Sequence, residues 1–307
     1  MNQPPPVLIL AAFGVSDPEA LEDLLNIKAR VAAAWPRAET RLAFTSRVLR
    51  GQWRCRADEA SFRASHPGVP AEIYEIKSPL TLLAEAQEEG PRPLVVQPLH
   101  VSAGEEYADL KNMTAALAGI ETLRPDQRPF PLLHLARPAL GDGGADDLER
   151  AARALRPLAE KAGRSGSALV LVGHGSRRLT SAVYGELEKI LRRGGEPVHI
   201  GLLEGGPGPE EIIVALAGEH GRDHGPRPIL LAPLLAAAGR HARDDLAGPE
   251  PDSWASRLRA AGHPVEIHLQ GLGSLDAWAD LYVEQVRQGL AALETGRFPA
   301  GTQSCLA

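Results

Sequence analysis

The feature that most constrains this chain is an alternation of short, uniformly apolar runs with longer amphipathic segments. Strands that are buried on both faces read as continuous apolar runs, which is typical of parallel sheets covered by helices. We therefore predict an α/β fold of doubly wound parallel sheets with helices on both faces. The expected strands lie at residues 7–12, 41–45, 94–99, 132–136, 168–172, 198–203, 229–234 and 265–269. The expected helices lie at residues 16–34, 78–89, 146–162, 182–192, 209–218, 253–261 and 275–290.

The second half of the chain echoes the first. Residues 7–16 align with residues 168–177, and residues 93–99 align with residues 228–234, in the same order. A glycine and then an Asp-Leu step follow each member of the second match. This pattern favours a duplicated unit, although any two strand–helix units share some similarity. We predict two similar lobes, residues 1–140 and residues 141–307.

Three strand ends in the second half each present a side chain that can bind a metal. His174 follows one expected strand between two glycines, Glu204 follows the next, and His241 follows a third after a short loop. Ligands bind at the carboxyl ends of strands in open α/β sheets, and imidazole with carboxylate suits divalent first-row metals. We predict a metal site here, the alternative being two loop histidines and a solvated glutamate. Phe13 stands where the second half has His174, so we expect one such site.

Composition and missing motifs exclude several classes of function. The net charge of −6 and the aromatic content of 4% argue against a nucleic-acid partner. No phosphate-binding loop, dinucleotide turn, H-E-x-x-H motif or nucleophile elbow occurs, so we expect no nucleotide cofactor. Cys55 and Cys305 cannot build a disulfide framework. No secretory signal and no membrane-spanning apolar run is present, so we expect no membrane partner and a cytoplasmic location.

Several stretches together resemble one known family, and they run in family order along nearly the whole chain. These stretches are residues 10–14 (LAAFG), 44–47 (FTSR), 96–101 (VQPLHV), 104–107 (GEEY), 173–176 (GHGS), 203–205 (LEG), 238–248 (AGRHARDDLAG) and 252–254 (DSW). In this combination the chain resembles the CbiK-type anaerobic cobalt chelatases, which are sirohydrochlorin cobaltochelatases of the class II chelatase superfamily.

The resemblance implies two flavodoxin-like lobes with the active-site cleft for a tetrapyrrole between them. It implies that His174, Glu204 and His241 handle the metal and carry catalysis. Two positions depart from the family pattern: Ser176 replaces the usual threonine, and Gly-Gly-Pro-Gly follows Glu204 where an aromatic residue is common. The tail after about residue 298 has no assigned counterpart. The residues expected to contact the tetrapyrrole in the first half are Phe13, Ser46 and His100.

The implied activity is ATP-independent insertion of Co²⁺ into sirohydrochlorin, with the metal as substrate and loss of two pyrrole protons. His174 is the best candidate for the base, because imidazole titrates near neutral pH. The alternatives are insertion of Fe²⁺ or Ni²⁺ by the same fold, and a metal or tetrapyrrole carrier without turnover. Assembly into a homo-oligomer stays open. Arginines flank the candidate strand ends and could meet the substrate's carboxylates: Arg47, Arg177, Arg178, Arg240 and Arg243.

Overall fold

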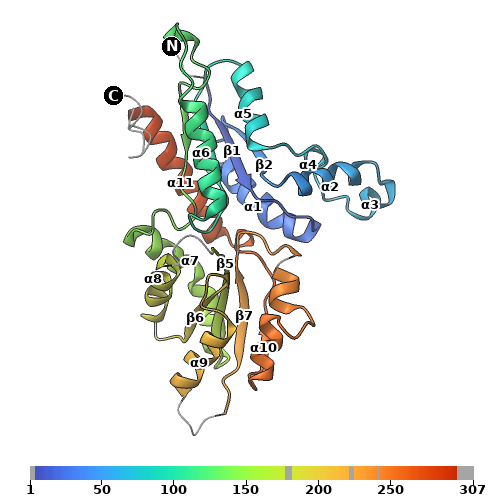
Figure 1. The fold of residues 1–307 in the computed structure, drawn as a ribbon, viewed down its shortest axis with the longest axis vertical. Helices are drawn as coiled ribbons and strands as arrows, with labels where there is room; N and C mark the ends of the chain where they lie inside the picture. The colour runs from blue at the N-terminus through green and yellow to red at the C-terminus, as the bar shows by residue number, and fades with distance from the viewer. Residues whose placement is uncertain (1–3, 177–181, 221–224, 241, 296–307) are drawn as a thin grey trace. The chain divides into compact units, whose positions relative to one another are not determined.

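The computed structural model describes residues 4–176, 182–220, 225–240 and 242–295 (Figure 1). The chain divides into two compact units, and α1 (Pro18–Ala34) contributes to both of them. The first unit comprises Met1–Pro18, Leu25–Ala139 and Asp280–Ala307, and the second comprises Glu19–Leu24 and Leu140–Ala279. The lobe boundary near residue 140 that the sequence suggests stays a prediction. Contacts between residues also group most of the last helix with the first unit.

The first unit is built on a four-stranded parallel sheet. Its strands are β1 (Val7–Ala12), β2 (Glu39–Phe44), β3 (Leu94–Pro98) and β4 (Leu133–Leu135), in the order β2-β1-β3-β4. Every residue of β1 and β3 is buried, which explains why these strands read as continuous apolar runs. Ala12 pairs with Phe44 and Ala11 with Pro98, so three neighbouring strands end at one edge.

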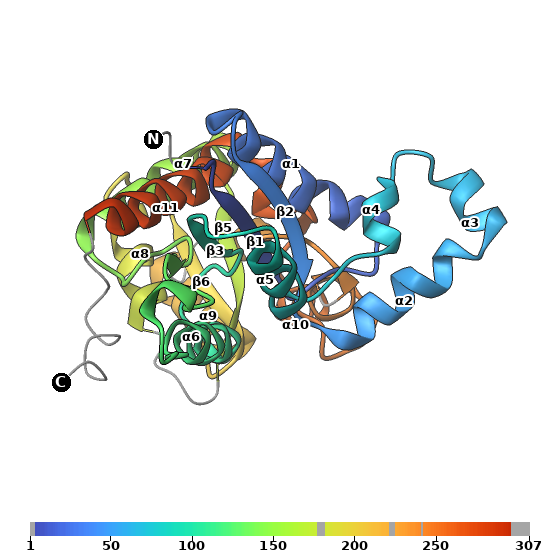
Figure 2. The same cartoon turned by 90° about the horizontal axis from the view of Figure 1, so that it is seen from above.

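Helices cover this sheet, and three of them project from it. The helices packed on the sheet include α5 (Pro79–Glu88), α6 (Glu105–Ala118) and α11 (Asp276–Thr295). The three that project form an arm in both views (Figures 1 and 2), namely α2 (Arg47–Ala57), α3 (Ala60–Ser65) and α4 (Ala71–Tyr74). Trp53 anchors this arm: its indole is fully buried, meets Phe62 and Tyr74 edge-on, and donates to the carbonyl of Val15 at 2.7 Å.

The second unit repeats the architecture of the first. Its strands are β5 (Ala168–Gly175), β6 (Val198–Glu204), β7 (Ile229–Leu234) and β8 (Val265–Ile267), all parallel in the order β6-β5-β7-β8. Its helices are α7 (Ala145–Arg164), α8 (Ala182–Arg192), α9 (Pro209–His220) and α10 (Trp254–Ala260), with short helical turns η2 (Ala242–Leu246) and η3 (Leu272–Ser274).

The two sheets share one topology, with the second strand at the edge, then the first, third and fourth. This identity confirms the repeat that the sequence echo predicts. The units differ between their second and third strands, where the first unit carries α2 to α5 and the described residues of the second carry α9 alone. The arm is therefore a property of the first unit.

The predicted strands and helices all occur, with ends that differ by a few residues. The predictions omit α2, α3, α4 and α6; α3 and α4 have only six and four residues, too few to show a helical period. Strand β5 extends three residues beyond its predicted end, through His174 to Gly175. In the described part of the chain, no helix combines the length and the apolar character needed to cross a membrane.

Candidate metal-handling site

His174 belongs to the end of strand β5 and not to the loop that follows the strand. The six residues of β5 before it are buried, whereas His174 is exposed at the carboxyl end of the strand. Gly175 follows with a φ of +74°, which glycine adopts at no steric cost. A Cβ atom on Gly175 would lie 2.0 Å from the carbonyl oxygen of Glu204, so only glycine permits this approach of the two backbones.

Glu204 ends the neighbouring strand, β6, and a second glycine makes the approach reciprocal. Gly205 has a φ of +80°, and a Cβ atom there would lie 2.3 Å from the carbonyl oxygen of Ser176. Gly175 is the register partner of Glu204. Side chains alternate between the two faces of a sheet along each strand. Because Glu204 pairs with Gly175, the residue after His174, the side chains of His174 and Glu204 start on opposite faces. They can therefore meet only beyond the carboxyl edge of the sheet.

The third predicted ligand belongs to the loop after β7. Leu234, the last residue of that strand, pairs with Gly173 of β5, so the loop leaves the sheet beside His174. His241 itself lies outside the described residues. The first and third strands of each sheet are adjacent, and their connections diverge there, which is where open α/β sheets bind ligands. The topology thus brings β5, β6 and the approach to His241 to one edge.

The described side chains do not by themselves complete a metal site. Among the residues that the structure describes, which exclude His241, no three histidine, cysteine or acidic side chains are grouped for metal binding. His174 and Glu204 therefore supply at most part of a ligand set. The three-ligand site stays a prediction.

The first unit places the expected tetrapyrrole residues at the corresponding edge of its own sheet. Phe13 is 45% exposed and directly follows β1, while His174 is the penultimate residue of β5. Ser46 caps α2 and donates its backbone N–H to the carbonyl of Phe13 at 3.0 Å, so these two residues are neighbours. His100 follows β3, and its Nε2 atom lies 3.0 Å from Oε2 of Glu106 on α6. All three residues follow strand ends, but only Phe13 and Ser46 are joined by a hydrogen bond.

Helix α2 carries a cluster of three arginines, Arg47, Arg50 and Arg54, of which the sequence predicted only Arg47 as a candidate. Arg50 donates to the carbonyls of Phe44 and Thr45 at the end of β2, and burial and the charges of Arg54 and Arg47 lower its pKa. None of these three arginines forms an ion pair with a described residue. Their spacing of three and four residues places them on one helix face, a signal that would have required α2 to be predicted.

Two solved structures share this fold over nearly the whole chain. SirB from Bacillus subtilis with Fe³⁺ superposes with a TM-score of 0.61 at 15% identity, covering 96% of this chain and 98% of SirB. The structure of CbiX, described as the terminal enzyme for biosynthesis of siroheme in denitrifying bacteria, gives a TM-score of 0.51 at 19% identity, covering 92% and 98%. This chain therefore has the fold of SirB and CbiX.

Sequence relatives show the family. The family model for cobalt chelatase (CbiK) matches residues 7–291. The sirohydrochlorin cobaltochelatase CbiKC of Nitratidesulfovibrio vulgaris is 30% identical over 287 residues, covering 94% of this chain and 91% of the relative. The sirohydrochlorin cobaltochelatase of Salmonella typhimurium is 28% identical over 284 residues, covering 92% and 96%. The chain belongs to the CbiK cobalt chelatase family.

Proposed function

We propose that this protein inserts Co²⁺ into sirohydrochlorin without a nucleotide. The observation that supports this most is the reciprocal glycine contact, which brings His174 and Glu204 to adjacent strand ends in a chain of the cobalt chelatase family. The relatives named above carry this activity in their names, over nearly the whole length shared with this chain.

The reaction needs a group that presents the metal and a group that accepts two pyrrole protons. In this proposal Glu204 and His241 would hold the metal with His174. His174 would take one of the two pyrrole protons as the ring nitrogens bind the ion, and the other proton would pass to solvent water. An imidazole suits the second task, because its usual pKa lies near neutral pH, where a general base is most effective. Incomplete protein ligation leaves coordination positions open for the ring nitrogens.

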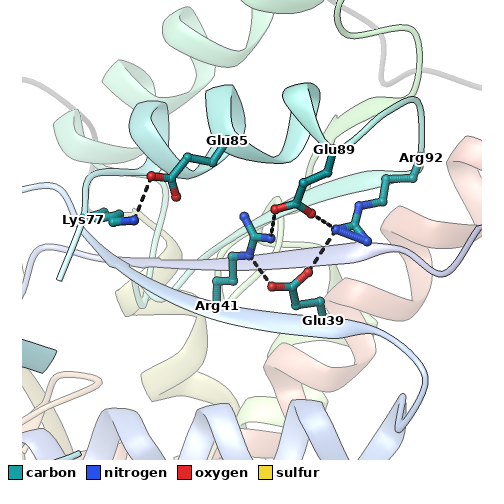
Figure 3. Close-up of polar contacts among 6 residues, drawn as sticks. All are labelled: Glu39, Arg41, Lys77, Glu85, Glu89 and Arg92. Carbon is teal, nitrogen blue, oxygen red and sulfur yellow. Dashed lines mark hydrogen bonds and ion pairs between the residues drawn. The ribbon is translucent and has the colours of Figure 1, made fainter. Parts of the chain in front are cut away.

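The substrate is a polycarboxylate, yet the protein has a net charge of −6. Local cations must therefore meet it, and we propose Arg47, Arg50 and Arg54 for this role, beside the exposed Phe13. Two other arginines of the same unit are paired with carboxylates. Figure 3 shows Arg41 and Arg92 each between Glu39 and Glu89. Arg47, Arg50 and Arg54 have no such acidic partners among the described residues, which supports their role toward an anionic ligand.

Fe²⁺ and Ni²⁺ are the metals to compare with Co²⁺, since affinity alone follows the Irving–Williams order and does not select the physiological ion. The test is an anaerobic absorbance assay with sirohydrochlorin and each metal in turn, with and without protein. Acceleration over the spontaneous reaction that is greatest for Co²⁺ supports the proposal. Acceleration greatest for another metal corrects the ion. A bound-tetrapyrrole spectrum without acceleration indicates a carrier, and no spectral change rejects this substrate.

A further inference from the structure

Asp23 is a buried carboxylate that the predicted metal ligands do not include. It lies near the start of α1, in the part of that helix that belongs to the second unit, and only 6% of it is exposed. Its Oδ2 atom accepts a hydrogen bond from the backbone N–H of Ala238 at 3.0 Å. The backbone of Gly271 provides a second hydrogen bond to the same carboxylate. One side chain thus joins two separate loops.

Those two loops run alongside each other. The carbonyls of Leu235 and Ala236 accept hydrogen bonds from the N–H groups of Leu272 and Gly273, both at 2.8 Å. This ladder covers the first residues after β7, and the Asp23 carboxylate continues it at Ala238. Beyond Ala238 the chain reaches the predicted ligand His241 within three residues. Asp23 is therefore the last described tertiary anchor of the loop before that ligand.

The packing around Asp23 admits little movement. A Cβ atom on Gly271 would lie 2.2 Å from Oδ2 of Asp23, and one on Gly273 would lie 2.5 Å from the Asp23 carbonyl oxygen. Burying a carboxylate is costly unless hydrogen bonds compensate it, and a position needed only for packing is better filled by an apolar side chain. Retaining an acid here is best explained by the two N–H groups that it holds.

We propose that Asp23 is a positioning residue for the metal-handling loop: by holding Ala238 beside Gly271, it fixes the described stretch of the loop after β7 that leads to the predicted ligand His241. This inference rests on the proposed function of that site. Asp23 does not touch the metal; it acts through the backbone of the loop.

The test measures metal binding directly, without the tetrapyrrole. The full-length protein and its variants Asp23→Asn and Asp23→Ala are titrated with Co²⁺, following the visible absorbance of the bound ion. An asparagine preserves the shape of the side chain but has one acceptor oxygen where the carboxylate has two, and its amide N–H₂ group can only donate. We expect Co²⁺ binding to weaken by about 10-fold or more in both variants, the range seen when outer partners of metal ligands are removed.

Asp147→Asn is the matched control. Asp147 is 5% exposed, belongs to the same unit, and accepts a hydrogen bond from Arg150 at 2.6 Å. It should lose stability to a similar degree while binding Co²⁺ like the wild type. Wild-type affinity in both Asp23 variants, equal weakening in Asp147→Asn, or no Co²⁺ binding by the wild type would overturn the proposal. If Asp23→Ala fails to fold, Asp23→Asn alone decides.

The same variants separate this inference from the proposed function. In the chelatase assay, we expect the Asp23 variants to show a raised KM for Co²⁺, an unchanged KM for sirohydrochlorin, and recovery of rate at high metal concentration. A wild type that binds Co²⁺ through this loop but never inserts it would remove the proposed activity and leave the positioning role standing. A wild type that inserts Co²⁺ with no change in the Asp23 variants would do the reverse.

Discussion

The carbonyl oxygen of Glu204 occupies the space that a side chain on Gly175 would need, 2.0 Å from the position of its Cβ atom. The contact joins the ends of β5 and β6 where the register pairs these same two residues. Ser176 and Gly205 repeat the arrangement in the opposite sense. The glycines around His174 therefore set the spacing of two strand ends, in addition to freeing the backbone for a turn.

The first prediction concerns Gly175→Ala. The substitution places a methyl group against the Glu204 carbonyl and imposes a positive φ on alanine. We expect a loss of about 1–3 kcal/mol in the free energy of unfolding, the usual cost of a residue held in such a conformation. The rate of metal insertion should fall strongly, by more than the loss of folded protein explains, because the ends of the strands that carry His174 and Glu204 would be pushed apart. Urea unfolding and the chelatase assay measure the two effects.

Gly185→Ala is the control for this change. Gly185 lies in α8, and a Cβ atom there meets nothing within 4 Å. Alanine favours a helix interior over glycine, so stability should be unchanged or rise by about 0.5–1 kcal/mol with full activity. If Gly175→Ala behaves like Gly185→Ala, the close approach of the strands has no functional role.

The second prediction separates the roles of the two site residues. His174→Ala should lower the rate of metal insertion by about 10²–10⁴-fold, the usual contribution of a positioned base, with little effect on stability because His174 is exposed. Glu204→Gln keeps the size of the side chain and removes its charge, so Co²⁺ binding should weaken. Rates and Co²⁺ titrations on both variants check this. Wild-type turnover in His174→Ala would refute its assignment as base.

The third prediction tests the arginines of α2. Arg54→Gln should raise the KM for sirohydrochlorin by about two- to fivefold, as expected for an exposed ion pair, with kcat nearly unchanged. Added salt should raise the wild-type KM more steeply than that of the variant, because it screens the attraction that the variant lacks. The measurement is steady-state kinetics at low and high ionic strength.

Arg92→Gln serves as the comparison. Arg92 is held by Glu39 and Glu89 in the network of Figure 3, so its loss should reduce stability and leave the KM for sirohydrochlorin unaltered. Equal changes in KM for Arg54→Gln and Arg92→Gln would show a general effect of net charge in place of a local contact.

The fourth prediction concerns pH. Burial, with a smaller effect from the charge of Glu22, raises the pKa of Asp23 from 3.8 to about 6 against the hydrogen bonds from Ala238 and Gly271. Between these two values the folded protein keeps a proton that the unfolded chain releases, so this group's contribution to stability falls as pH rises and is lost above about pH 6.

Asp23→Asn has no such titration. Relative to the variant, the wild type should therefore lose about 1–3 kcal/mol of unfolding free energy between pH 4 and pH 8. Urea unfolding of both proteins at several pH values tests the sign. A difference between the two proteins that is constant across this range would contradict the raised pKa.

Local sequence patterns were sufficient for the architecture. Both faces of β1 and β7 are buried, and their continuous apolar runs indicate central parallel strands. The repeated order of such runs predicts that the two sheets share one topology. The position of His174 and Glu204 could also be predicted from the sequence, because a polar side chain at the end of a buried strand lies at the edge where these sheets bind ligands. The arm of α2 to α4 could not be predicted, since its small core around Trp53 joins residues far apart in sequence.

By itself, the sequence determined the alternation of elements, the repeat and the residues that stand at the strand ends, because each depends on short-range periodicity. Only the tertiary structure decided that Gly175 meets the Glu204 backbone, that the α2 arginines lack acidic partners among the described residues, and that Asp23 holds the loop before His241. Asp23 and Ala238 are 215 positions apart. No periodicity within a helix encodes such a contact, which depends on how α1 packs against the loops after the folded strands.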